Sequence, residues 1–276
     1  MFDAAPPPSD HALLQDSAFA AALKLCGQSP IKLPCGLTLL CRRILGIPFV
    51  MLPRAEPPRD LDAQLASVGL ARVPTILSPE RPCKDMRAVR IRLGIATATI
   101  DLTPKTDTRR ASLHAKWRNQ LCRAEDSPLQ IRSTSLKTNH PILRLEEQQA
   151  RARRYANWPT NLTAAFATVA PDQTRLFTAY LFGTPVSHML FLLHGGRATY
   201  HIGHTNEEGR KYHAHNLLLW NASCWLAKSG RTSLDLGLLH TDTHSLNRFK
   251  LRSGAHSYDT GGTWLRWHPF ARKTAP

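Results

Sequence analysis

Residues 174–204 read TRLFTAYLFGTPVSHMLFLLHGGRATYHIGH, and this stretch decides the fold. Its three apolar runs are separated by Gly183-Thr184 and by Gly195-Gly196. Runs rich in apolar and aromatic residues, joined by glycine-containing pairs, are typical of strands connected by tight hairpin turns. The pattern therefore predicts a three-stranded antiparallel meander.

The residues after this meander continue the same architecture. Residues 205–214 predict a polar loop, and residues 215–230 are apolar on nearly every side of a helix, as in a buried helix that ends at Gly230. Residues 232–239 predict a further strand, and residues 261–269 predict the strand that closes the sheet. This order predicts an α+β domain with a mixed central sheet flanked by helices.

Upstream of the meander, residues 108–125 have the periodicity of an amphipathic helix. Its apolar stripe contains Leu113, Trp117, Leu121 and Ala124. A second stripe adjoins the apolar one and contains Arg109, Lys116 and Arg123. This basic stripe is either one wall of a cleft or a solvated face whose aliphatic stems cover the core.

The first hundred residues mix shorter helices and strands. We expect a helix over 11–26 capped by Ser9 or Asp10, a helix over 59–70, and strands in 37–52, 73–77 and 87–102. A further helical stretch over 145–170 is broken at Trp158-Pro159. We therefore expect two domains, a small α+β domain over residues 1–103 and a larger one over residues 104–276.

Charge is the most unusual bulk property of the chain. Its 36 Lys and Arg residues against 20 Asp and Glu residues give a formal net charge of +16. The excess is concentrated in residues 105–160, with 12 basic against 5 acidic residues, and in residues 245–276, with 6 against 1. A basic surface of this kind attracts polyanions such as RNA, DNA, nucleotide diphosphates or acidic membranes.

Several classes of protein lack their sequence signature here. The chain has no GxSxG, Walker loop, GxGxxG or HExxH, and its six cysteines form no CxxC pair. We therefore expect neither a resident cofactor nor a metal, although ten of the thirteen histidines follow residue 187. The cysteine spacing, the absence of a signal-peptide pattern and apolar runs too short to span a bilayer predict a soluble cytoplasmic protein.

Cations and glycines come together in residues 245–267, SLNRFKLRSGAHSYDTGGTWLRW. Phe249 lies between Arg248 and Lys250, and Gly254 follows closely. Cations on pliable backbone suit a site that brings an anionic or carbonyl-bearing ligand close to the chain.

Two segments together resemble the FemABX family. The first is TIDLTP followed by a helix that carries Lys116, Arg118, Asn119, Ala124 and Glu125. The second is the order of meander, loop, buried helix, SLDLG, LNRFKLRSGA and GGTWL, so that the resemblance covers about residues 101–267. FemABX proteins are GNAT-fold transferases that build the peptide bridges of peptidoglycan. The resemblance implies a GNAT-fold acyltransferase domain over residues 104–276 and a reduced GNAT-like half over residues 1–103.

The resemblance also implies a reaction, in which a primary amine attacks an activated acyl carbon. Aminoacyl-tRNA is the donor in the peptidoglycan members and acyl-CoA in other GNAT enzymes, so one of these is the expected co-substrate. A cell-wall precursor is one candidate among amine-bearing acceptors. The lysine of the family's Arg-Phe-Lys motif matches Lys250, whose ammonium would stabilise an oxyanion. The donor- and substrate-binding residues implied are Lys116, Arg118, Asn119, Arg210, Lys211, Asn216, Arg248, Phe249, Arg252 and Gly254.

The loop before the buried helix departs from the pattern of ordinary GNAT enzymes, which have Arg/Gln-x-x-Gly-x-Gly/Ala there. This chain reads EEGRKYHAHN, with one glycine, so Arg210, Lys211 and the helix N-terminus near Asn216 are expected to substitute in part. His201, His213 and Asp235 are candidate general bases by residue type, and positioning of the two substrates is the alternative to a protein base.

The expected function is that of a cytoplasmic N-acyltransferase, and the net charge favours aminoacyl-tRNA as its donor. A non-catalytic nucleic-acid-binding protein on a GNAT-like fold is the alternative, and a scaffold that binds partner proteins is a third reading. The presence of Lys250 and its neighbouring glycines favours the enzyme.

Overall fold

The computed structural model describes residues 10–44, 46–84 and 86–270. The chain forms two compact units, each built from two separate segments. The larger unit contains residues 1–13 and 97–257, and the smaller unit contains residues 14–96 and 258–276. The sequence-based division at residues 103 and 104 differs from this one at two places. Residues 97–101 pair into the sheet of the larger unit, and the chain returns to the smaller unit after residue 257.

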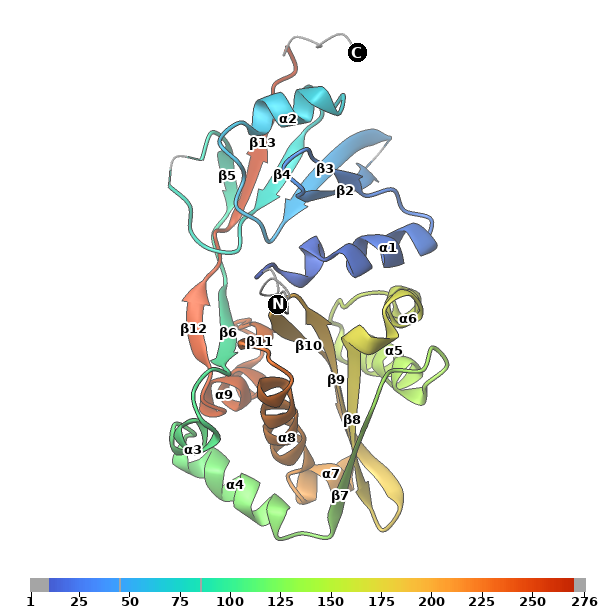
Figure 1. Cartoon of the computed structure of the whole chain (residues 1–276), viewed down its shortest axis with the longest axis vertical. Helices are drawn as coiled ribbons and strands as arrows, with labels where there is room; N and C mark the ends of the chain where they lie inside the picture. Colours follow the sequence, from blue (N-terminus) through green and yellow to red (C-terminus); the bar gives the residue numbers. More distant parts are fainter. Residues whose placement is uncertain (1–9, 45, 85, 271–276) are drawn as a thin grey trace, which may run out of the picture. The chain divides into compact units, whose positions relative to one another are not determined.

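The larger unit is built on a seven-stranded mixed sheet (Figure 1). Its strand order is β12-β6-β11-β10-β9-β8-β7, and the bounds in that order are His256–Asp259, Ala96–Asp101, Ser233–Leu238, Arg197–Thr205, Thr184–His194, Thr174–Leu181 and Leu129–Thr134. Strands β8, β9 and β10 pair antiparallel in sequence, which confirms the predicted meander. Strand β7 at the far edge was not predicted.

Helices cover both faces of this sheet (Figure 1). Their bounds are α3 Thr106–Ala111, α4 Ala115–Glu125, α5 Pro141–Arg153, α6 Thr160–Val169, α7 Glu207–Lys211, α8 Ala214–Lys228 and α9 His244–Arg252, with a short 3₁₀ turn at Pro171–Gln173. Helices α4 and α8 pack together on one face, where Trp117, Leu121 and Leu218 enter the core with the inward residues of the strands. The predicted break at Pro159 lies between α5 and α6.

Strands β10 and β11 of this sheet pair parallel, and they separate before either strand ends. Their register runs from Arg197 opposite Ser233 to Thr199 opposite Asp235 and stops there. Each strand also carries an irregularity beyond that point, next to Tyr200 in β10 and next to Asp235 in β11. The two strand ends therefore diverge beyond Thr199 and Asp235.

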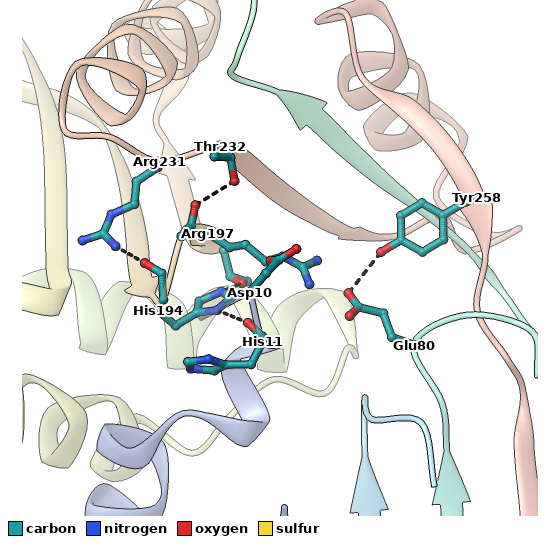
Figure 2. Close-up of polar contacts among 11 residues, drawn as sticks. Asp10, His11, Glu80, His194, Arg197, Arg231, Thr232 and Tyr258 are labelled. Carbon is teal, nitrogen blue, oxygen red and sulfur yellow. Dashed lines mark hydrogen bonds and ion pairs between the residues drawn. The ribbon is translucent and has the colours of Figure 1, made fainter. Parts of the chain in front are cut away.

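The N-terminal segment is tied to the β9–β10 turn of the larger unit (Figure 2). His194 Nδ1 donates to the His11 carbonyl at 2.8 Å, so its Nε2 accepts the hydrogen bond from Thr199 Oγ1 at 2.9 Å. Arg197 Nε lies 3.5 Å from an Asp10 carboxylate oxygen. These contacts hold Asp10 and His11 against the turn that joins β9 to β10.

The smaller unit has a six-stranded sheet of order β1-β2-β3-β4-β13-β5, with bounds Ile31–Lys32, Thr38–Ile44, Ile47–Pro53, Thr75–Ser78, Thr263–Arg266 and Val89–Arg92. Its helices are α1 Ser17–Leu25 and α2 Leu61–Ser67, and a 3₁₀ turn at Leu13–Gln15 precedes them. The buried Arg266 side chain pairs with Asp62 at 2.6 Å and donates to the Ala71 carbonyl at 3.0 Å. These bonds anchor β13 to α2 and to the residues that follow α2. Elsewhere in the unit, the Tyr258 hydroxyl donates to the Glu80 carboxylate at 3.2 Å (Figure 2).

Three sequence-based expectations about single elements were wrong. Residues 261–269 do not close the larger sheet, because β13 pairs with β4 and β5 of the smaller one. Residues 108–125 form two helices, because His114 Nδ1 accepts a hydrogen bond from the Lys116 N–H at 3.2 Å and thereby starts α4. The first helix begins at Ser17, because Asp16 caps it through the Ala18 N–H at 2.8 Å; Ser9 lies outside the described residues.

Candidate active site

Beyond the point where β11 separates from β10, β11 contacts the side chain of Lys250 on α9. This side chain is only 6% exposed, and its Nζ donates to the Leu238 carbonyl at 2.9 Å. Burial lowers the pKa of Lys250 to about 8, and the negative charge of Asp235 opposes part of that shift. A Cβ added to Gly237 would lie 3.8 Å from Nζ, so the ammonium lies close against the backbone of β11.

Asp235 fixes the shape of β11 at the point of divergence. Its Oδ1 accepts from the Gly237 N–H at 2.7 Å and from Thr97 Oγ1 at 3.3 Å. Gly237 has φ 80°, a left-handed conformation that glycine adopts without strain. Together these features turn the Leu238 carbonyl toward Lys250. Asp235 thus acts on the lysine through the backbone and through its charge.

Helix α9 places the other residues of the Arg-Phe-Lys motif on different sides. The Phe249 ring packs on Trp117 and His215, with ring centroids 6.1 Å and 6.2 Å away. Arg248 is exposed to solvent. The motif was expected on pliable backbone, and this expectation was wrong, because His244–Arg252 is a regular helix.

The turn that follows α9 connects it to α4. The Arg252 carbonyl accepts from the His114 N–H at 3.1 Å. Gly254 has φ 84°, and a Cβ there would lie 2.9 Å from Ser112 Oγ. Gly254 is therefore needed for the close approach of this turn to the α3–α4 connection.

The N-terminus of α8 lies beside the same divergence. His213 precedes the helix with φ 52°, and its side chain makes no capping hydrogen bond to α8. His215 Nε2 donates to the His204 carbonyl on β10 at 3.1 Å, which links the first turn of α8 to the separated end of that strand. Asn216 is buried, and its Nδ2 contacts Gln120 Oε1 on α4 at 3.4 Å. The first turn of α8 thus has a fixed position between β10 and α4.

The loop expected at residues 205–214 contains the short helix α7. Gly209 there is a packing residue, because a Cβ would come within 2.5 Å of the Val186 carbonyl and its N–H already donates to Asn206 Oδ1 at 2.8 Å. Arg210 and Lys211 are exposed, and Arg210 Nη1 donates to the Thr205 carbonyl at 3.2 Å. The single glycine of this segment therefore packs α7 on β9 and does not offer its amide to a ligand.

Helix α4 presents the remaining basic residues of the predicted set. Lys116 and Asn119 are exposed, and Arg118 is half-buried with a long contact of 3.5 Å to the Ala111 carbonyl. Through Gln120, the same helix contacts Asn216 of α8. These side chains therefore lie on a helix that adjoins the α8 N-terminus.

Comparison with known proteins identifies the family of this domain. Residues 109–250 match the family model described as "Acetyltransferase (GNAT) domain", which covers just over half of the chain and ends at Lys250. The chain belongs to the GNAT acetyltransferase family. Comparison with curated protein sequences finds no match.

Solved structures share the fold over nearly the full length of this GNAT chain. A crystal structure of FemX superposes with a TM-score of 0.72 at 12% identity, covering 95% of this chain and 93% of the other. The C-terminal domain of a putative lysylphosphatidylglycerol synthetase from Agrobacterium fabrum has a TM-score of 0.60 at 15% identity, covering 91% and 87%. L-PGS from Bacillus licheniformis has a TM-score of 0.59 at 12% identity, covering 95% and 93%. The predicted α+β, GNAT-like fold is confirmed.

His201 lies apart from the Lys250 region of the GNAT domain. Its Nε2 hydrogen-bonds with Thr163 Oγ1 at 2.8 Å, and its ring packs on Trp158 at 4.7 Å between centroids. Burial lowers its pKa to about 4. The contacts found for this imidazole are with α6 and the segment before it, whereas Lys250 contacts β11.

The side chain of His213, another candidate base, makes no capping hydrogen bond to α8. Its pKa is lowered by partial burial and by the nearby Arg123.

Within residues 10–44, 46–84 and 86–270, no group of three His, Cys, Asp or Glu side chains is arranged to hold a metal ion. In the same ranges, every helix is too short or too polar to cross a membrane.

Three features of the site were not predicted from the sequence. These are the Leu238 carbonyl, the turn at Gly237 and the contact of His215 with β10. A glycine inside the strand pattern SLDLGLL is a known signal of a bulge, so Gly237 could have been found. The other two depend on how α8 and α9 pack and have no local signal.

Proposed function

We propose that this protein is an N-acyltransferase that transfers an aminoacyl or acyl group from an activated donor to a primary amine. The observation that carries the proposal is the buried ammonium of Lys250, held beside the point where β10 and β11 diverge. A preorganised cation in a site shielded from water stabilises negative charge that develops on a carbonyl oxygen. This is the charge that forms when an amine attacks an ester or a thioester.

The reaction is an acyl substitution. The lone pair of the acceptor nitrogen attacks the acyl carbon, a C–N bond forms, and the C–O bond of an ester or the C–S bond of a thioester breaks. The proton lost by the amine goes to the leaving oxygen or sulfur. Lys250 would hold the oxyanion of the tetrahedral intermediate. Because its pKa is lowered to about 8, the side chain is still mostly protonated at neutral pH.

The donor's phosphates would be held by basic side chains and by the first turn of α8. Arg210 and Lys211 precede that turn, and the side chain of the N-cap residue His213 does not cap it. Lys116 and Arg118 lie on the adjoining helix α4, and Arg248 is exposed on α9 beside Lys250. Phe249, Asn119, Asn216, Arg252 and Gly254 would shape and support this region.

Aminoacyl-tRNA is the donor we favour over acyl-CoA. The net charge of +16 suits a ligand with many phosphates. The Gly209 N–H already donates to Asn206 Oδ1, so this amide is not free to bind the pyrophosphate of CoA. This argues against a conventional CoA site. One protein of similar fold is described as a putative lysylphosphatidylglycerol synthetase, and its name contains an aminoacyl group. The acceptor is an amine, and cell-wall precursors belong to that class.

The test is a donor screen with mass-spectrometric detection of the amide. The purified protein is incubated with charged tRNA or with acetyl-CoA, together with a pool of primary amines. Lys250→Ala should reduce product at least about tenfold. The control is Lys228→Ala, which removes an exposed lysine from the last turn of α8. No amide with any donor, combined with tight tRNA binding, would favour the non-catalytic nucleic-acid-binding alternative.

A further inference from the structure

A pocket of about 210 Å³ opens among α3, α8 and the turn after α9, within the larger unit. Its inner wall is mostly apolar and is formed by Ile100, Pro104, Trp117, Leu219 and Trp220. Neither Lys250 nor the residues of β11 that surround it line this pocket. The pocket is therefore distinct from the Lys250 site, although Trp117 and Gly254 belong to the surroundings of both.

One buried cation, Arg109, lies in the wall of the pocket. It is 6% exposed, and its Nε donates to the Pro104 carbonyl at 3.2 Å and its Nη1 to Ser223 Oγ at 3.2 Å. Its Nη2 has only a weak contact with Cys224 Sγ at 3.9 Å. Among the described residues, no acidic side chain forms an ion pair with Arg109. A buried guanidinium without a counterion is costly, so the site favours an anion.

A second buried donor in the same wall, the indole N–H of Trp117, lacks a hydrogen-bond acceptor in the described part of the chain. Trp117 is 2% exposed, and its indole Nε1–H has no hydrogen-bond acceptor among the described residues. Buried indole N–H groups usually find one. The hydroxyls of Ser223 and Ser253 donate to the carbonyls of Trp220 at 2.8 Å and Lys250 at 2.6 Å, so their hydrogens are engaged and the N–H groups of Arg109 and Trp117 are the donors left for a ligand. The wall thus has spare N–H donors beside an apolar surface.

We propose that this pocket binds the carboxylate of a small organic acid of about amino-acid size, with Arg109 as its counterion. A guanidinium presents paired N–H groups that match the two oxygens of a carboxylate. Trp117, Leu219 and Trp220 would cover the apolar part of the ligand. The pocket is too small for a nucleotide, since sites for larger ligands are about 300–1,000 Å³.

The outer rim of the pocket limits which acids fit. Asp101 and His256 are exposed there, together with Thr108. The Asp101 carboxylate is partly engaged, because it accepts from the Thr103 N–H at 2.9 Å and from its hydroxyl at 2.7 Å. A second anionic group on the ligand would meet Asp101, so we expect monocarboxylates to bind better than dicarboxylates.

The test uses 3-phenylpropionate, its neutral amide 3-phenylpropionamide, and inorganic phosphate. Binding to the full-length protein is followed by ligand-detected NMR and by the fluorescence of the two tryptophans in the wall. We expect the acid to saturate below about 10 mM. The amide should bind at least about tenfold more weakly, because a charged hydrogen bond is lost.

The matched variants are Arg109→Met and Arg110→Met. Both arginines lie on α3 with Cζ 5.7 Å and 5.6 Å from the Trp220 ring centroid, but Arg110 is bonded to Glu125. Only Arg109→Met should weaken binding of the acid, by about tenfold or more. If Arg109→Met unfolds the protein, the comparison of acid with amide in the wild type still decides. Equal binding of acid and amide, no binding of the acid, or binding of phosphate alone would overturn the proposal.

Discussion

Replacement of Lys250 by Met separates the catalytic and the structural consequences of one buried charge. Met has a similar length and no charge, and the side chain at this position is only 6% exposed. A preorganised cation at a developing oxyanion contributes about 2–4 kcal/mol to transition-state stabilisation. Its removal should therefore lower kcat roughly 30- to 1,000-fold.

The stability of the variant should move the other way. A pKa lowered from 10.5 to about 8 means that keeping Lys250 charged at neutral pH costs the folded state roughly 3 kcal/mol. The folded state bears this full cost at pH values below about 8. The cost decreases as the pH rises from 8 toward 10.5, the pKa of the unfolded lysine, because in that range the folded protein loses the proton and the unfolded chain keeps it. Lys250→Met removes this cost but also removes the hydrogen bond to the Leu238 carbonyl, and a hydrogen bond from a charged group stabilises the folded state by about 1.5–3 kcal/mol. Lys250→Met should thus be as stable as the wild type at neutral pH, or somewhat more stable.

Two measurements check this reasoning. Thermal unfolding of both proteins at about pH 7 and pH 9.5 should show the wild type gaining stability relative to Lys250→Met as pH rises. Acyl-transfer kinetics with the donor found by the screen should show the loss in kcat. The exposed Lys228→Met serves as control. The reasoning fails if Lys250→Met keeps wild-type kcat, or if it loses activity and melting temperature together.

Three further predictions follow from single features of the larger unit. Gly209→Ala should lower the free energy of unfolding by about 1–3 kcal/mol, because the added Cβ meets the Val186 carbonyl at 2.5 Å; a phosphate-binding glycine would instead change donor affinity at constant melting temperature. The pKa of the buried His188 is lowered to about 4, so folding stability should fall as pH drops below the unfolded value of about 6.5, and denaturant titrations should show a flatter pH dependence for His188→Gln. Binding of tRNA should weaken steeply as salt rises from about 50 to 200 mM in a filter-binding assay, whereas a flat response would exclude an extended phosphate contact and favour acyl-CoA.

Elements with a strong local pattern were predictable from the sequence. The meander followed from apolar runs divided by Gly183 and Gly195, both of which adopt positive φ in the turns. The buried helix followed from its all-round apolar surface, and Gly230 ends it as expected. Lys250 was identified through its motif, and the family match over residues 109–250 ends at this residue.

The boundaries of other elements could not be predicted from periodicity alone. The periodicity across 108–125 is helical, but it does not show that a histidine side chain caps a second helix at Lys116. Likewise, cations followed by Gly254 suggested loose backbone, whereas His244–Arg252 is helical and only the turn after it bends. Periodicity records which residues can share a face, and capping decides where a helix starts.

The resemblance of its motif to the FemABX family singled out Lys250, whereas the sequence by itself determined the α+β class, the buried helix and the basic character. Each of these depends on residue type or on spacing within about 20 residues. The tertiary structure alone decided the environment of that lysine, because the Leu238 carbonyl, the Asp235 charge and the burial that lowers its pKa come from packing α9 against β11. It also decided that Arg109 and Trp117, eight residues apart in the sequence, belong to two helices that line the same pocket. The pKa of a side chain and the shape of a cavity depend on residues that are distant in the sequence and come together only when the chain folds.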